Sequence, residues 1–93
     1  MAGCRHTLLV CHTPPHGTAT DVVGDGVHVG SPAVRAFIER VQPEVCLTGH
    51  IHEARATDVL GTTQIINPGA LSGGGYARIR LAEGRLTASL SVL

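Results

Sequence analysis

Two short runs of continuous apolar residues, separated by one amphipathic segment, most constrain how this chain can fold. The runs are residues 7–11 and 45–47, and consecutive apolar positions are typical of strands that are covered on both faces. Between them, Ser31 is a suitable helix N-cap and Pro32 suits the first helical position. Apolar residues then follow with helical spacing at Val34, Phe37, Ile38 and Val41. The pattern predicts a strand, a helix ended by Pro43, and a second strand parallel to the first.

The rest of the chain is less regular. Residues 13–30 are rich in proline and glycine, which predicts a long loop. After residue 52 the sequence changes to short segments of alternating apolar and polar residues at 55–60, 62–67, 76–81 and 86–92. These segments predict a mainly antiparallel β-meander. The expected fold class is therefore α/β, with one βαβ-like unit followed by the meander.

Composition limits the class of protein. The chain has 93 residues, of which 43% are hydrophobic and 15% charged, and its formal net charge is zero, so we expect one globular unit. Its seven basic residues are all arginine and are dispersed among seven acids, which does not favour a nucleic-acid partner. No apolar run approaches the roughly 20 residues of a membrane span and no signal peptide is evident, so we expect a cytoplasmic protein without a membrane partner. Three cysteines without C-x-x-C spacing indicate reduced thiols.

Each apolar run is followed at once by a histidine motif. Cys11-His12-Thr13-Pro14-Pro15 follows the first run, and Thr48-Gly49-His50-Ile51-His52-Glu53 follows the second. Active sites of α/β proteins are built where parallel strands end. Several imidazoles that converge on one crevice each need a partner, and a transition-metal ion is the simplest shared one. The sequence therefore predicts a metal site at this edge of the sheet.

Four motifs in consistent order carry a family resemblance. They are His12-Thr-Pro-Pro, His28-Val-Gly-Ser, Gly49-His50-Ile51-His52-Glu53 and Asn67-Pro68-Gly69. Over residues 7–81 the chain resembles the C-terminal half of a calcineurin-like metallophosphoesterase, most similar to the small prokaryotic branch. The resemblance implies part of an αββα sandwich and a metal-dependent phosphoester hydrolase.

The same resemblance implies roles for individual residues. His12 and His50 would bind one divalent transition metal (Mn, Fe or Zn) and His52 a second, and residues 50 and 52 of an extended segment point the same way. Gly49 would let the backbone approach the ions, and Glu53 would either orient His52 or be an exposed charge.

The remaining motifs are expected to have supporting roles. His28 lies in the Gly-rich segment, where it could reach a phosphate, whereas His16 is expected to be solvated and Asp21 to be a turn residue. Asn67 and Gly69 would form a tight structural turn beside the site.

The resemblance also implies that ligands are lacking. Residues 1–93 would form the C-terminal part of a single domain, and its N-terminal half would supply the first Asp-x-His ligands, the bridging Asp, the metal-binding Asn and the general-acid His. Three imidazoles can hold at most one of the family's two ions, so the chain alone is expected to be inactive and to lack a complete catalytic set. It could be a fragment, a split-gene product that needs a partner chain, or a decayed paralogue. If its strands lack the neighbours of the absent half, self-association is expected. The alternative function is a non-catalytic metal-binding or interaction module.

Overall fold

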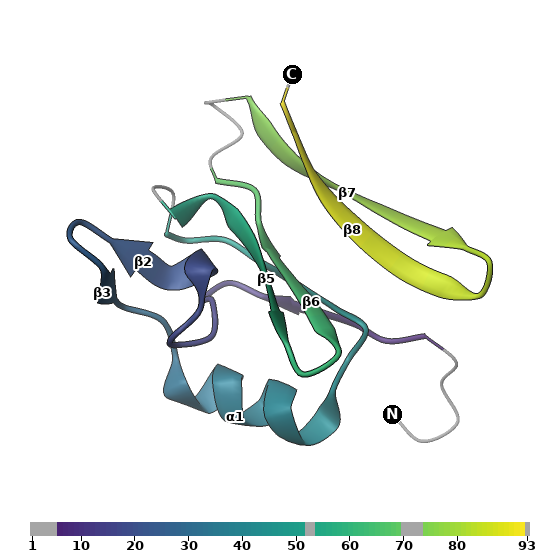
Figure 1. Ribbon diagram of the computed structural model, residues 1–93, viewed down its shortest axis with the longest axis horizontal. Coiled ribbons are helices and arrows are strands. Elements are labelled where there is room, and N and C mark those ends of the chain that lie inside the picture. The colour runs from purple at the N-terminus through teal and green to yellow at the C-terminus, as the bar shows by residue number, and fades with distance from the viewer. Residues whose placement is uncertain (1–5, 52–53, 70–73, 93) are drawn as a thin grey trace.

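A four-stranded mixed sheet forms the centre of the computed structural model, which describes residues 6–51, 54–69 and 74–92 (Figure 1). Its strands, in spatial order, are β1 (Leu8–Cys11), β4 (Val45–Thr48), β6 (Thr63–Asn67) and β5 (Ala56–Leu60). Strands β1 and β4 are parallel, with Leu8 opposite Val45 and Cys11 opposite Thr48. The α/β class and the parallel pair predicted from the two apolar runs are confirmed.

Helix α1 (Pro32–Val41) connects the two parallel strands and has the predicted start. The side chain of Ser31 accepts a hydrogen bond from the backbone N–H of Val34 at 3.1 Å, and Pro32 occupies the first turn. The helix ends at Val41, two positions before Pro43, because Gln42 adopts a left-handed conformation with φ of 53°. The carbonyl of Ile38 accepts both the backbone N–H of Gln42 at 2.8 Å and its side-chain amide at 2.7 Å, so the last turn is closed by two hydrogen bonds.

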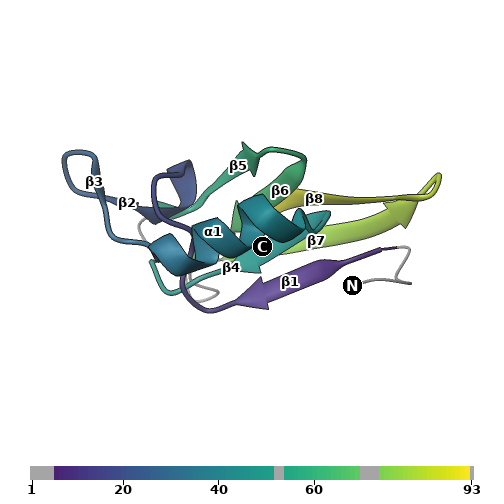
Figure 2. The same cartoon turned by 90° about the horizontal axis from the view of Figure 1, so that it is seen from below.

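The core lies between α1 and one face of the sheet. Ile38, Cys46 and Ile65 are fully buried there, and Figure 2 shows α1 lying across the strands. Partly buried apolar residues complete this layer: Leu9, Val34 and Leu60. The pairing of Leu9 with Cys46 and of Cys46 with Ile65 places these side chains on one face, as the alternation of a strand requires.

The segment 13–30, predicted as a loop, is held by short elements of its own. It contains a 3-10 turn, η1 (Ala19–Asp21), and a small antiparallel pair, β2 (Val22–Val23) with β3 (Val27–His28). The Ser31 N–H donates to the Pro14 carbonyl at 2.8 Å, and the His16 N–H donates to the Ser31 carbonyl at 3.1 Å. Both ends of the segment are therefore fixed to each other at the start of α1.

The predicted meander is two separate hairpins. Strand β6 pairs with β5 on one side and, in parallel, with β4 on the other, so the first hairpin belongs to the central sheet. Strands β7 (Gly75–Ala82) and β8 (Arg85–Val92) form a two-stranded sheet that no backbone ladder joins to the first in the described residues. The expectation of one continuous meander is corrected on this point, because alternation predicts a strand but not its neighbour.

The β7–β8 hairpin lies on the side of the central sheet opposite α1 (Figure 1). Side-chain hydrogen bonds connect it to the sheet. The Gln64 amide donates to the Leu86 carbonyl at 2.8 Å and accepts from the Ala88 N–H at 3.2 Å. The Glu44 carboxylate accepts from the Leu86 N–H at 3.0 Å. These side chains replace the backbone ladder that would otherwise satisfy the edge of β8.

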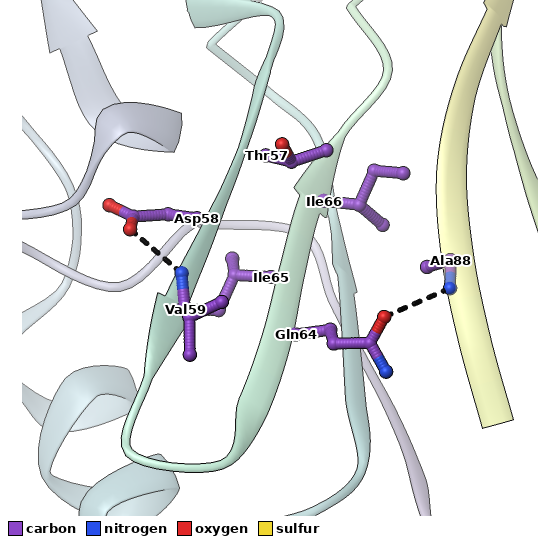
Figure 3. A pocket seen from close by; sticks show the side chains of 7 residues that line it. All are labelled: Thr57, Asp58, Val59, Gln64, Ile65, Ile66 and Ala88. Carbon is purple, nitrogen blue, oxygen red and sulfur yellow. Dashed lines mark hydrogen bonds between the residues drawn. The ribbon is translucent and has the colours of Figure 1, made fainter. Parts of the chain in front are cut away.

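A cleft of about 370 Å³ lies where this hairpin meets β5 and β6. Figure 3 shows its lining, which is Thr57, Asp58, Val59, Gln64, Ile65, Ile66 and Ala88. Gln64 is already bonded to β8, and Asp58 accepts from the backbone of Ala19 and Val59. Among the described residues, no histidine lines this cleft, and the candidate site lies elsewhere.

In the described part of the chain, no helix is long and apolar enough to cross a membrane.

Candidate functional site

The candidate site lies at the ends of the two parallel strands. His12 directly follows the last residue of β1, and His50 comes two residues after the last residue of β4. The His12 carbonyl accepts hydrogen bonds from the Gly49 N–H at 3.2 Å and from the Thr48 hydroxyl at 3.4 Å. These bonds extend the pairing of β1 and β4 beyond the strands and hold the two histidines side by side.

The two imidazoles are in direct contact. His12 Nε2 and His50 Nδ1 are 2.9 Å apart, and the ring centroids are 4.5 Å apart with an interplanar angle of 56°. One nitrogen must donate a proton while the other accepts it, because two N–H groups or two lone pairs at this distance would repel. Both side chains are exposed, so the pair is open to a ligand from solvent.

The pair fits one transition-metal ion. Metal–nitrogen bonds of about 2.1 Å at a right angle would place two imidazole nitrogens about 3 Å apart, and a tetrahedral angle would place them about 3.4 Å apart. The observed 2.9 Å between the two nitrogens is close to the first value. Within residues 6–51, 54–69 and 74–92, no third His, Cys, Asp or Glu completes a group that could hold a metal.

The backbone at His50 differs from the sequence-based expectation. His50 has a φ of 63°, in the left-handed region that non-glycine residues seldom adopt. The Ile51 N–H donates to the Gly49 carbonyl at 2.6 Å, so the chain turns here instead of continuing as a strand. The premise that residue 50 lies in an extended segment is therefore wrong. The expected direction of His52 relative to His50 stays a prediction. His52 and Glu53 themselves lie outside the described residues.

Asn67 and Gly69, the expected turn residues, hold the loop after His50 by hydrogen bonds. Asn67 is fully buried, and its amide donates to the Ile51 carbonyl at 2.9 Å and to the Thr20 carbonyl at 3.1 Å. Its side-chain oxygen accepts from the N–H of Gly69, whose φ of 75° favours glycine. A Cβ at Gly49 would meet no described atom within 4 Å, so the space beside that residue is open.

Asp21 is far more than a turn residue. Its carboxylate is fully buried and accepts backbone hydrogen bonds from Gly17, Thr18 and Gly30 at 3.0, 3.1 and 2.9 Å. It also contacts His28, whose Nδ1 lies 2.6 Å from Asp21 Oδ1. Burial alone would raise the pKa of Asp21, but the hydrogen bonds from His28 and the three backbone groups together lower it below its ordinary value.

Only one signal in the sequence pointed to this role. Thr18 and Asp21 have the spacing of a capping box, and both reciprocal hydrogen bonds of that motif are formed around η1. The contacts of Asp21 to Gly30 and His28 depend on how the segment folds back on itself, which residue spacing does not encode. His16 is exposed, and its ring centroid lies 5.8 Å from that of His28.

The described cysteines are not part of this chemistry. Cys46 is fully buried in the core, and burial, with a smaller contribution from Cys11, raises the pKa of its thiol to about 12. Both Cys11 and Cys46 are free thiols. A thiol that stays protonated at neutral pH is a poor nucleophile and metal ligand.

Two sequence comparisons identify proteins that are related to this chain. The family model for the metallophosphoesterases of the calcineurin superfamily matches residues 2–89. An uncharacterized protein of Methanocaldococcus jannaschii is 40% identical over 68 residues, which cover 69% of this chain and 31% of that protein.

Solved structures show a similar partial match. One crystal structure aligns with a TM-score of 0.71 at 29% identity and covers 88% of this chain and 32% of the other. A solution structure of a Thermotoga maritima protein has a TM-score of 0.55 at 27% identity, with coverage of 95% and 48%. The chain therefore spans about a third to a half of the length of these relatives. Since the family model matches most of its length, the chain belongs to the calcineurin superfamily of metallophosphoesterases.

Proposed function

We propose that this chain supplies imidazole ligands to the divalent-metal centre of a phosphoester hydrolase. The carrying observation is the contact between His12 Nε2 and His50 Nδ1 at 2.9 Å, at the ends of adjacent parallel strands. His52 follows in the same motif and is proposed as a further ligand. Mn, Fe and Zn are the candidate ions, because imidazole suits transition metals of this type.

The surroundings of the pair support ligand exchange. Both rings are exposed and are bonded to each other instead of to a buried carboxylate or carbonyl. An exposed histidine pair contributes little to stability, because water can replace either partner. The left-handed backbone of His50 costs about 1 kcal/mol or more, and such strain concentrates at functional sites.

The chain's own residues would position the metal and leave the rest of the site open. The bonds from Gly49 and Thr48 to the His12 carbonyl fix the distance between the two ligand-bearing loops. Asn67 fixes the loop that follows His50 through the Ile51 carbonyl. When bound, divalent ions would polarise the phosphoester and lower the pKa of a water molecule that attacks phosphorus. The phosphoester is the proposed substrate class.

Calorimetric titration with Mn²⁺ and Zn²⁺ tests the proposed site. The wild-type chain should bind one ion, and a His12→Ala, His50→Ala double variant should lose at least tenfold in affinity. Binding should also weaken as the pH falls through roughly 6.5, where free imidazoles protonate and can no longer coordinate. Equal affinity of the wild type and the double variant would overturn the proposal.

A His6→Ala variant is a matched control. His6 contacts Glu44 at 2.8 Å near the start of β1 and β4, at the opposite end of the same two strands. Removing this imidazole changes the histidine count without changing the proposed site. We expect its metal affinity to stay within about twofold of the wild type, whereas an equal loss in both variants would indicate non-specific binding to surface histidines.

A further inference from the structure

His28, which is not part of the proposed metal pair, is held by a buried carboxylate. Asp21 is fully buried, and its Oδ1 lies 2.6 Å from His28 Nδ1. Since a carboxylate can only accept, Nδ1 must carry the proton of this hydrogen bond. The other ring nitrogen, Nε2, has no hydrogen bond within the described residues.

Backbone hydrogen bonds hold the Asp21 carboxylate in place independently of His28. Backbone N–H groups of Gly17, Thr18 and Gly30 donate to Asp21, which leaves its oxygens little freedom to move. A Cβ added at Gly30 would lie 2.5 Å from the Pro14 carbonyl oxygen and 2.8 Å from Asp21 Cβ. The close packing of Gly30 therefore helps to keep the Asp21 side chain in place.

His28 remains accessible despite this partner. Its side chain is 37% exposed while that of Asp21 is 0% exposed. Because Nδ1 faces the buried carboxylate, Nε2 is the ring nitrogen that remains for a ligand. The arrangement has the form of a carboxylate-oriented imidazole, which fixes both the tautomer and the ring orientation.

The His28 segment lies at the same end of the molecule as the histidine pair. Figure 2, in which all four strands are labelled, shows the β2–β3 hairpin beyond the carboxyl ends of β1 and β4. Three hydrogen bonds connect the regions. The Ser31 N–H donates to the Pro14 carbonyl, two residues after His12, and the Asn67 amide donates to the carbonyls of Thr20 and Ile51. The segment is thus attached to both loops that carry the proposed metal ligands.

We propose that His28 contacts the phosphate of the substrate through Nε2, and that Asp21 is its positioning residue. The inference rests on the proposed phosphoester function for the identity of its ligand. In the protonated ring, Nδ1–H donates to Asp21 and Nε2–H donates to a phosphoryl oxygen. The negative charge of Asp21 compensates the imidazolium, and the exposed His16 ring, 5.8 Å away, is the other titratable group beside it.

The ring tautomer can be measured without any substitution. At pH about 8.5, where free imidazoles are neutral, nitrogen NMR shifts of the wild-type chain should show His28 protonated on Nδ1 and unprotonated on Nε2. Free imidazole side chains favour the opposite tautomer. A His28 ring that carries its proton on Nε2 would overturn the role of Asp21.

Phosphate binding tests the role of His28. Inorganic phosphate and phenyl phosphate are titrated at pH about 6 without metal and with chelator, against sodium chloride of equal ionic strength. Both phosphates should shift the His28 ring signals, and His28→Ala should weaken phosphate binding roughly tenfold, as expected for a charge-assisted hydrogen bond. Asp21→Asn should weaken it several-fold. Unchanged ring signals, or unchanged affinity in His28→Ala, would contradict the proposal.

Two control variants separate this proposal from that of the metal site. His16→Ala removes the neighbouring ring and should keep phosphate affinity within about twofold. The His12→Ala, His50→Ala double variant should lose metal affinity yet retain the phosphate-induced shifts at His28, so the two proposals can fail independently. Loss of these shifts in either control would mean that His28 does not form the contact, and the proposal would fall.

Discussion

Replacing Asp21 with alanine should be among the most destabilising single changes in this chain. The substitution removes the acceptor for three backbone N–H groups, at 2.9 to 3.1 Å, and for His28. Each buried donor left without a partner costs roughly 1–3 kcal/mol. Water can reach the partly buried donors of Gly17 and Gly30, so we take the lower end of that range for them and expect a total of about 4 kcal/mol.

That cost is a large part of the available stability. At 0.05–0.15 kcal/mol per residue, a chain of 93 residues has a free energy of unfolding of roughly 5–14 kcal/mol. Urea denaturation followed by circular dichroism at pH 7 measures the difference between Asp21→Ala and the wild type. Asp21→Asn keeps one acceptor oxygen and should cost less, about 1–2 kcal/mol.

Asp58→Ala is the matched control for this experiment. Asp58 also accepts two backbone hydrogen bonds, from Ala19 at 2.8 Å and from Val59 at 2.7 Å, but both bonds are exposed. Because water can replace the lost acceptor, we expect a cost of about 0.5–1 kcal/mol. If Asp21→Ala destabilised the chain no more than Asp58→Ala, the reasoning from burial and hydrogen-bond number would be refuted.

Four further predictions concern the core, the surface, pH and activity. Ile65→Ala should cost about 2–5 kcal/mol in urea denaturation, because Ile65 is fully buried beneath α1; a loss below 1 kcal/mol would disprove its core role. Val10 is 68% exposed on the edge strand β1 and should favour self-association. Val10→Lys should therefore lower the dimer content measured by ultracentrifugation and should also bind less hydrophobic dye. Unchanged dimer content and dye binding would count against this. Because the pKa of Asp21 is lowered in the folded chain, its ionised carboxylate stabilises the fold at any pH above the unfolded pKa of about 3.9, and this stabilisation is lost as the pH falls through the lower folded pKa. Asp21→Asn should therefore lose less stability than the wild type between pH 5 and 2. Parallel stability curves of the two proteins would refute this. The chain alone should hydrolyse bis-p-nitrophenyl phosphate no faster than free Mn²⁺, because three imidazoles cannot hold two ions, whereas metal-dependent turnover lost in His50→Ala would contradict this.

Local signals were sufficient for the elements around the core. The continuous apolar residues of β1 and β4 and the Ser31-Pro32 start of α1 each specify their structure within a few residues. Parallel pairing of β1 and β4 followed from the single helix between them. The insertion of β6 beside β4 was not predictable in this way, because Ile65 would be equally apolar in a meander and the choice of neighbour is made by long-range packing.

The site was predictable only in part, for a related reason. The motifs placed His12 and His50 at neighbouring strand ends, and the structure brings their rings into contact. The left-handed turn at His50 and the hydrogen bonds of Asp21 involve backbone groups, which are the same in nearly every residue and so leave no signal in the sequence. Residue types therefore identify the chemistry of a strand end, but they do not identify which loop carboxylate will fold onto which imidazole.

The two histidine sites should respond to mutation separately, because different forces hold them. His12 and His50 are positioned by β1 and β4, whose pairing is stabilised by Cys46 and its apolar neighbours in the core. His28 is positioned by Asp21 and the backbone donors around it, which form a polar cluster outside that core. Asn67 bonds to both regions, but within the described residues Asp21 and the apolar core residues share no side-chain hydrogen bond, and such positions usually contribute additively. Combining Asp21→Asn with a conservative core substitution should therefore destabilise the chain by the sum of the two single losses. Metal affinity at His12 and His50 should respond to changes in β1 and β4, whereas phosphate affinity at His28 should respond to changes around Asp21.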